Sequence, residues 1–579
     1  MSTSDLPTSG SELYESTRSA SPTARINTMP QAGRDHTQVP VEEVLEVDDI
    51  QGNILAGFNK DFQTFLFLKI HDRAITKDWL RSLTPCIAST AEVLLFNKLH
   101  RSLRSRRQED PQGMAATWVN IAFTYQGIQM LTSEEEANKF QDDPFRLGLY
   151  KRSGFLGDPV DPHSDGHPNQ WVVGGSKNVP DILLMIASDD PTYLAAEVKR
   201  LKSGIQALSI STDGNRGKNA LEIIYEQAAA ARSDIPGHEH FGFKDGISQP
   251  GIRGRVSEAV QDFLAPRLIA SEDPSASEFA RPGQPLIWPG QFVLGYKCQK
   301  ADDFLEPLPA LELSLPWTRN GSFLVVRRLR QDVPAFWSFV HDQAARLAQK
   351  PGFAGMTPEL FATLLVGRWP SGAPLMRSPD TDSPALGDDD FANNHFFYVA
   401  PTKPITLIEI PSYPGDSFPQ AKGDESGAYC PHAAHIRKVN PRDMATDTGG
   451  ARDTRTHLII RRGIAFGHPV KDPTHPTPEE LKEERGLMFL SYQASIENQF
   501  EFLTNHWTNA DKQPRPGGHD PVIGQHRDQE GNRIRQVEIQ GNDGSTEVIN
   551  IPLEWVTPTG GGYFFAPSLS ALKTVLSAR

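Results

Sequence analysis

The stretch of sequence that decides the fold is Asp-Ile-Leu-Leu-Met-Ile-Ala, residues 181–187. Periodicity alone cannot assign so short an apolar run, but its length and the turn residues around it favour a buried strand. A helical pattern follows at 191–202. Three further apolar runs of strand length lie at 65–70, 118–123 and 220–225. The elements approximate the order β-α-β-β-α-β, which predicts a ferredoxin-like unit with an antiparallel sheet.

The second half of the chain repeats this plan in its architecture, although not in its residues. Strand-like runs lie at 292–296, 322–327, 458–461 and 487–492, and helical patterns lie at 334–347 and 495–506. Pro334 stands at a first-turn position that a helix tolerates. We therefore predict the α+β class, with two ferredoxin-like domains that contain antiparallel sheets.

Composition suggests where these domains begin and end. Residues 1–45 are rich in Ser, Thr, Pro and Gly, so we expect a disordered N-terminal tail there. The predicted domains are 46–260 and 291–579, with a linker or insertion at 261–290. Stretches rich in Pro, Gly and Asp are expected to be surface loops, and they lie at 151–180, 264–290, 368–393, 412–428 and 509–547.

Overall composition narrows the class of protein. The 579 residues include 38% hydrophobic and 22% charged residues, as in soluble globular proteins. A net charge of −14 argues against nucleic-acid binding, which needs a basic surface. Three widely spaced cysteines do not suggest disulfides or a zinc finger. Because we find no signal peptide and no long apolar stretch, we expect no membrane association and a cytoplasmic location.

The segment His-Phe-Gly-Phe-Lys-Asp-Gly-Ile-Ser-Gln-Pro, residues 240–250, holds a candidate catalytic acid. Asp245 lies between Gly242 and Gly246, with the aromatic and aliphatic neighbours Phe241, Phe243 and Ile247. Glycine permits a close approach to the backbone, and a partly desolvated carboxylate can handle protons. The alternative is an ordinary Asp-Gly surface turn.

This segment resembles the Gly-x-x-Asp-Gly motif of the dye-decolorising peroxidases, a haem family. Residues 430–442, Cys-Pro-His-Ala-Ala-His-Ile-Arg-Lys-Val-Asn-Pro-Arg, closely resemble the family's segment with the haem-ligating histidine. The resemblance implies that His435 binds the haem iron, although a lone histidine is more often structural or exposed. Five such matches occur in chain order between 240 and 524. They favour one of the longer intracellular subfamilies, with a fold like a dimeric α+β barrel and a haem cavity mainly in the C-terminal half.

The resemblance also implies roles for residues downstream. In 458–467, Arg461 matches the arginine beside the iron, and Arg462 should face the other side of the strand. The alternative is a solvated arginine pair at the end of a core strand. Other residues are expected to contact haem or to support its ligand: Gly246, Ile247, Arg437, Arg442, Leu487, Phe489 and Asp520. Asp520 would bind the ligand histidine, whereas Leu487 and Phe489 could equally be plain core residues.

The resemblance predicts a peroxidase with one haem b per chain. Asp245 would serve as acid and base and Arg461 would stabilise charge, with hydrogen peroxide and small or bulky one-electron donors as substrates. Trp507 aligns with a surface tryptophan proposed as an electron relay in relatives, but it could instead be a half-buried anchor. Phe466 departs from relatives that carry a tyrosine there. The sequence leaves monomer and homodimer both open.

Three other readings of the sequence stay open. The chain could bind or handle haem through His435 with little turnover. Cys430 could ligate haem in an oxygenase, although the surrounding sequence does not resemble that family. His238, His240 and Asp245 could bind a metal in a hydrolase, although no third ligand at helical spacing supports this.

Overall fold

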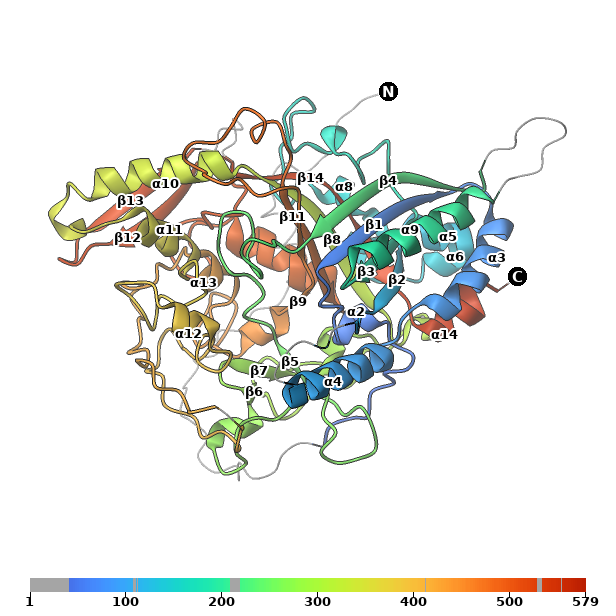
Figure 1. The fold of residues 1–579 in the computed structure, drawn as a ribbon, viewed down its shortest axis with the longest axis horizontal. Helices are drawn as coiled ribbons and strands as arrows, with labels where there is room; N and C mark the ends of the chain where they lie inside the picture. The colour runs from blue at the N-terminus through green and yellow to red at the C-terminus, as the bar shows by residue number, and fades with distance from the viewer. Residues whose placement is uncertain are drawn as a thin grey trace, which may run out of the picture. The chain divides into compact units, whose positions relative to one another are not determined.

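Nine strands drawn from both halves of the chain form one antiparallel sheet in the computed structural model (Figure 1). The structure describes residues 41–107, 111, 113–208, 219–411, 413–527, 534–552 and 554–578. From Val41 onward they cluster as one compact unit, and the predicted domain boundaries remain predictions. None of the described helices is long and apolar enough to cross a bilayer.

The sheet consists of two ferredoxin-like halves. The first half contributes β1 (Phe62–Ile70), β2 (Thr117–Phe123), β3 (Ile182–Ser188) and β4 (Leu221–Ala230), in the order β4-β1-β3-β2. The second half contributes β8 (Ser322–Gln331), β9 (Ile460–Arg461), β10 (Ile464–Phe466), β11 (Gly486–Gln493) and β14 (Val556–Ala566), in the order β10-β11-β8-β14, with β9 paired to β11. The predicted α+β class with antiparallel sheets is confirmed.

The two halves meet where β14 pairs with β2 through Phe565 and Phe123. At the other ends of the strand order, β10 and β4 lie next to each other. The sheet therefore curls back on itself and encloses an apolar core. Because side chains alternate between the two faces of each strand, both halves contribute residues to this core. Phe67 of β1 and Val326 of β8 both belong to it.

The first half of the chain contains longer and shorter helices. The longer ones are α3 (Arg73–Leu83), α4 (Thr90–Arg107), α5 (Tyr125–Leu131) and α9 (Pro191–Gln206). The short ones are α2 (Gly52–Leu55), α6 (Glu134–Ala137), α7 (Asp143–Leu147) and α8 (Leu149–Arg152). Leu66 and Leu68 of β1 alternate with the inward residues and pack with α3, α5 and α9 (Figure 1). Of these helices, α9 lies where the sequence predicted a helical pattern at 191–202.

The second half carries α10 (Val333–Leu347), α11 (Pro358–Val366), α12 (Pro384–Asp388), α13 (His435–Val439), the helix η8 (Ile496–Thr508) and α14 (Leu569–Ala571). A hairpin of β12 (Arg535–Gln540) and β13 (Thr546–Ile551) packs with α10 and α11 in a separate apolar cluster. A small sheet contains β5 (Gly251–Ile252), β6 (Phe279–Arg281) and β7 (Gln284–Ile287). The stretches 264–290 and 509–547, predicted to be loops, therefore contain strands.

Two further predictions about the fold were wrong. The apolar run 292–296 is not a strand, because Gly295 has a φ of +91° and the segment turns while Phe292 and Val293 pack in the core. Residues 41–45 belong to the folded body rather than to a disordered tail. Glu42 is buried there, with the guanidinium of Arg267 at 2.6 Å. Residues 1–40 of that predicted tail lie outside the described part of the chain.

Candidate active site

A cavity of about 320 Å³ lies in the second half of the structure, against the sheet. Its walls come from the 241–250 loop, β8, β11, α13 and the middle and end of η8. Most of the residues predicted from the sequence line it: Asp245, Gly246, Ile247, His435, Arg442, Arg461, Leu487 and Phe489. Residues distant in the chain are thus brought to one site.

Asp245 and Arg461 form an ion pair at the cavity wall. Arg461 Nη1 lies 2.8 Å from Asp245 Oδ1, and its Nη2 donates to the carbonyl of Ser248 at 3.0 Å. Gln249 fixes the arginine's backbone by accepting from its N–H at 3.2 Å and donating to its carbonyl at 3.0 Å. Gly246 has a φ of +78°, which lets its N–H turn back to Asp245 Oδ1 at 2.6 Å.

This pairing keeps Asp245 ionised. Burial disfavours the charged carboxylate, but the charge of Arg461 and the N–H of Gly246 outweigh burial and hold the pKa of Asp245 below its ordinary value. The two side chains are 40% and 31% exposed, and both line the cavity. A molecule in the cavity can therefore reach an anionic proton acceptor and a cation side by side.

His435 and Asp520 form the second pair of the site. His435 begins α13, and its Nδ1 lies 2.8 Å from Asp520 Oδ2. The other oxygen of the buried Asp520 accepts the N–H groups of Val522 and Ile523, each at 2.9 Å. Although burial opposes it, the charge of Asp520 raises the pKa of His435. The pair favours the tautomer with a proton on Nδ1, which leaves Nε2 as a metal-binding lone pair.

One wall of the cavity contains two arginines. Arg442 and Arg368 both donate to Asn394 Oδ1, at 2.5 and 3.0 Å, and neither has a carboxylate partner within the described ranges. Burial, together with the charge of Arg442, lowers the pKa of Arg368 to about 9. The buried hydroxyl of Tyr398, also in this wall, has no hydrogen-bond partner among the residues described. These groups are arranged to receive an anion.

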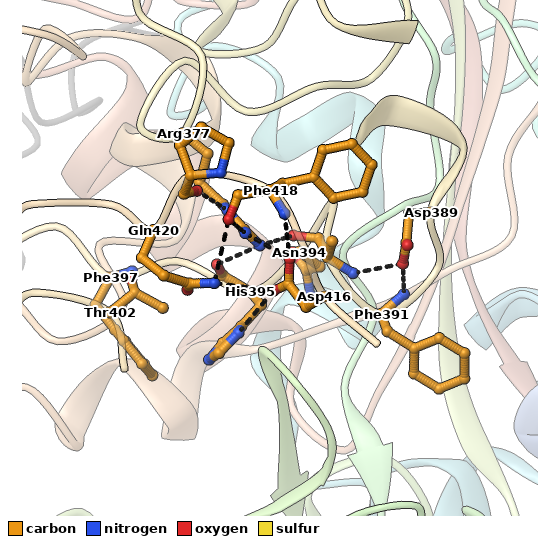
Figure 2. A network of polar contacts seen from close by, with 12 residues as sticks. Arg377, Asp389, Phe391, Asn394, His395, Phe397, Thr402, Asp416, Phe418 and Gln420 are labelled. Atoms are coloured by element: carbon orange, nitrogen blue, oxygen red, sulfur yellow. Dashed lines mark hydrogen bonds and ion pairs between the residues drawn. The ribbon is translucent and has the colours of Figure 1, made fainter. Parts of the chain in front are cut away.

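The loop around Asn394 is held by its own polar network (Figure 2). Arg377 donates to Asp416 Oδ1 at 2.8 Å and to the carbonyl of Ala392 at 2.8 Å. His395, next to Asn394, lies 3.8 Å from Asp416 and is buried. The loop that carries Asn394, to which both arginines of the cavity wall donate, is therefore held in place by these contacts. Sequence reasoning missed Arg368 and Tyr398 because neither belongs to a motif.

The remaining walls are apolar. Leu487 and Phe489 stand two residues apart on β11 and face the cavity, as alternation predicted. Leu329 of the neighbouring strand β8 lies beside them, since it pairs with Leu487 in register. Ile436 and Val439 of α13 add to the lining. A cavity with such walls suits a largely apolar group.

Two predicted roles do not fit the structure. Arg437 does not line the cavity: it is buried and binds Asp424 Oδ2 at 3.0 Å and the Cys430 carbonyl at 2.6 Å. It is two residues from His435 on a helix, so it points away from it. Trp507 is not at the surface: it is fully buried against Phe502, with ring centroids 5.0 Å apart.

The other readings of the sequence lose support. Cys430 is buried outside the cavity lining. The ring of His240 binds the Phe466 carbonyl at 2.8 Å, and the ring of His238 binds the Pro236 carbonyl at 3.0 Å. Among the residues the structure describes, no group of three or more His, Cys, Asp or Glu side chains could hold a metal ion. His238, His240 and Asp245 therefore do not form a metal site in the described part of the chain.

Comparisons with known proteins identify the family of this chain. Family models for the "DyP dimeric alpha+beta barrel domain" and for "Dyp-type peroxidase, C-terminal" match residues 49–218 and 416–515. The dye-decolorizing peroxidase msp1 of Mycetinis scorodonius is 32% identical over 542 residues, which cover 92% of this chain and 88% of the relative.

Solved structures give the same result. An ancestral D-type dye-decolorizing peroxidase is 30% identical, with a TM-score of 0.67 over 92% of this chain and 100% of that one. A dye-decolorizing peroxidase solved with 2,6-dimethoxyphenol is 27% identical, with a TM-score of 0.65 and the same coverage. The fold and site thus define a haem-type oxidoreductase. The chain belongs to the dye-decolorising peroxidase family, whose members bind haem.

Proposed function

We propose that this chain reduces hydrogen peroxide at a haem iron bound by His435 and oxidises one-electron donors. The observation that carries the proposal is that Asp245, Arg461 and His435 line one cavity, where Asp520 holds the ring of His435. A protein that only binds or handles haem would need the histidine, but it would not need an ionised carboxylate paired with a guanidinium beside it.

The residues of the cavity fit haem b, one per chain. Nε2 of His435 would bind the iron, and Asp520 would fix the ring. The wall formed by Arg368, Arg442 and Tyr398 would receive the haem carboxylates. They would give the two arginines a counter-charge and the orphan hydroxyl a hydrogen-bond partner. Leu487 and Phe489, with Gly246 and Ile247, would line the face of the ring. Haem, when bound, supplies the redox chemistry.

The protein's own side chains would transfer the proton and stabilise the developing charge. Asp245 accepts a proton from one oxygen of hydrogen peroxide and returns it to the other oxygen, which leaves as water. Arg461 stabilises the negative charge that develops as the bond between the oxygens breaks. Because Arg461 is fixed by Ser248 and Gln249, it is already in place when the charge appears.

Phenols are the donors that we propose first, since a relative has been solved with 2,6-dimethoxyphenol. Bulky dyes cannot reach the buried cavity and would need a relay to the surface. Trp507 cannot serve as that surface residue, because it is fully buried. A cytoplasmic location and a monomeric or homodimeric state remain predictions from the sequence.

The direct test is the absorption spectrum of the purified protein during titration with haem. We expect binding of one haem per chain and a spectrum of histidine-ligated iron that changes when one equivalent of hydrogen peroxide is added. Peroxide-dependent oxidation of 2,6-dimethoxyphenol should follow. Saturable haem binding without any reaction with peroxide would favour a haem-handling protein instead.

The response to pH provides a second test. Asp245 acts as a base only when ionised, and its pKa lies below the ordinary value of about 3.9. Activity should therefore persist in mild acid and fall only as the pH drops through that low pKa. In Arg461→Leu the main charge that lowers this pKa is gone, so the acid limb should move to higher pH. Steady-state rates with a phenol between pH 3 and 7 measure the acid limb of the wild type and of Arg461→Leu. An acid limb at the same pH in both proteins would contradict the pairing of Asp245 with Arg461.

A further inference from the structure

Residues 237–245 form a small hairpin that ends at the catalytic carboxylate. His238 and Lys244 pair across it as an antiparallel bridge. At its base the N–H of Asp245 donates to the carbonyl of Gly237 at 2.9 Å. The direction in which the Asp245 side chain points therefore depends on the shape of this hairpin.

The carboxylate of Glu239 lies inside the hairpin and accepts three hydrogen bonds. Its Oε1 accepts the N–H of Phe243 at 2.9 Å. Its Oε2 accepts the N–H of Phe241 at 2.8 Å and the amide of Gln331 at 2.6 Å. Gln331 is the last residue of β8. One side chain thus closes the hairpin from within and connects it to the central sheet.

Only a carboxylate can make this set of bonds. Both oxygens of Glu239 face N–H donors, so a glutamine would turn its own NH₂ group toward at least one backbone N–H and leave that bond unmade. Glu239 also lines the same cavity as Asp245, at the start of the hairpin that ends with it. The two carboxylates of this segment are therefore placed for different tasks.

Other contacts hold the hairpin to the body of the protein. The indole of Trp337 donates to the Phe241 carbonyl at 3.1 Å, and the ring of His240 binds the Phe466 carbonyl at 2.8 Å. The ring of Phe241 packs against that of Phe336, with centroids 4.5 Å apart and the planes tilted by 33°. Loss of the Glu239 carboxylate would therefore leave the hairpin attached but would remove the bonds that set its inner shape.

We propose that Glu239 is a positioning residue for the reaction with peroxide: it holds the 237–245 hairpin in the shape that presents Asp245 to the cavity. The proposal rests on the proposed function, because it assigns Asp245 the proton transfer. Glu239 would affect the reaction only through the position of Asp245. The hydrogen bond from Gln331 to Glu239 connects that position to β8.

The test is a double-mutant cycle of Glu239→Gln and Asp245→Asn in the haem-loaded protein. Small misplacements of a catalytic group cost up to ~100-fold in rate, so Glu239→Gln alone should slow the peroxide step roughly 10- to 100-fold. In the Asp245→Asn background it should cause no further loss. Additive losses would overturn the proposal, and so would an unchanged rate in Glu239→Gln. No effect of Asp245→Asn itself would instead overturn the proposed function.

Two further variants test whether the effect is specific to this hairpin. Gln331→Leu removes one of the three bonds and should give a smaller loss of the same non-additive kind, even if Glu239→Gln does not fold. The exposed Glu312→Gln is the matched control and should react like the wild type. In the haem-free protein, hydrogen exchange of peptides that span 237–246 should accelerate in Glu239→Gln while peptides from β1 stay protected. Unchanged exchange in the hairpin would overturn the proposal.

Discussion

Replacing Asp245 by asparagine is expected to slow the reaction with hydrogen peroxide by ~10²–10⁴-fold, the usual contribution of a positioned acid–base group. Asparagine has the same shape but cannot accept the proton. Stopped-flow absorbance of the haem-loaded variant, mixed with excess peroxide, measures the rate of the first step. Haem should stay bound, because Asp245 is not a ligand in the proposed site.

The matched comparison is Asp143→Asn, another aspartate that pairs with an arginine, Arg146, at 3.2 Å but does not line the cavity. It should react at the wild-type rate. If Asp245→Asn reacts as fast as the wild type, the proton must be handled elsewhere, and Asp245 loses its assigned role.

Replacing His435 by alanine is expected to have the largest effect on haem retention. The side chain supplies the proposed iron ligand, so its loss should weaken haem binding by more than the ~10–100-fold typical of losing a partner outside the ligand shell. Haem titration followed by gel filtration measures how much haem stays with the protein. Added imidazole should partly restore the spectrum, since it can occupy the space of the missing ring.

Asp520→Asn provides the graded comparison for the ligand. It keeps the bonds from Val522 and Ile523 on one oxygen but removes the charge that faces His435. Haem affinity should fall by ~10–100-fold. A variant His435→Ala that keeps haem as tightly as Asp520→Asn would show that another residue binds the iron.

Much of the fold could be predicted from the sequence, because the buried strands are continuous apolar runs. β1, β3, β8 and β11 all lie where such runs occur. β14 could not be found in this way, since it contains Pro558 and the glycines 560–562, which are depleted in strands. It forms because β8 pairs along its whole length, with a register shift after Pro558 that accommodates the proline. Tertiary pairing overrides local propensity there.

The site was predictable where a motif fixed a residue and its spacing, as for Asp245, His435 and Arg461. The structure brings these three residues into one cavity, although local chemistry alone left each of them with an ordinary alternative. Arg437 belongs to the same motif as His435, but it forms a buried ion pair with Asp424. Arg368 and Tyr398 join the site only through the folding of distant loops, and no local pattern marks them.

The position of β14 has a consequence for biosynthesis. It is the last strand of the large sheet along the chain, yet it lies between β8 and β2 in the strand order. While the ribosome is still making the chain, the first half can assemble its four strands, but the open edge of β8 has no neighbour until residues 556–566 emerge. Nascent chains of this protein should therefore carry an unpaired edge late in translation, when chaperones can bind it.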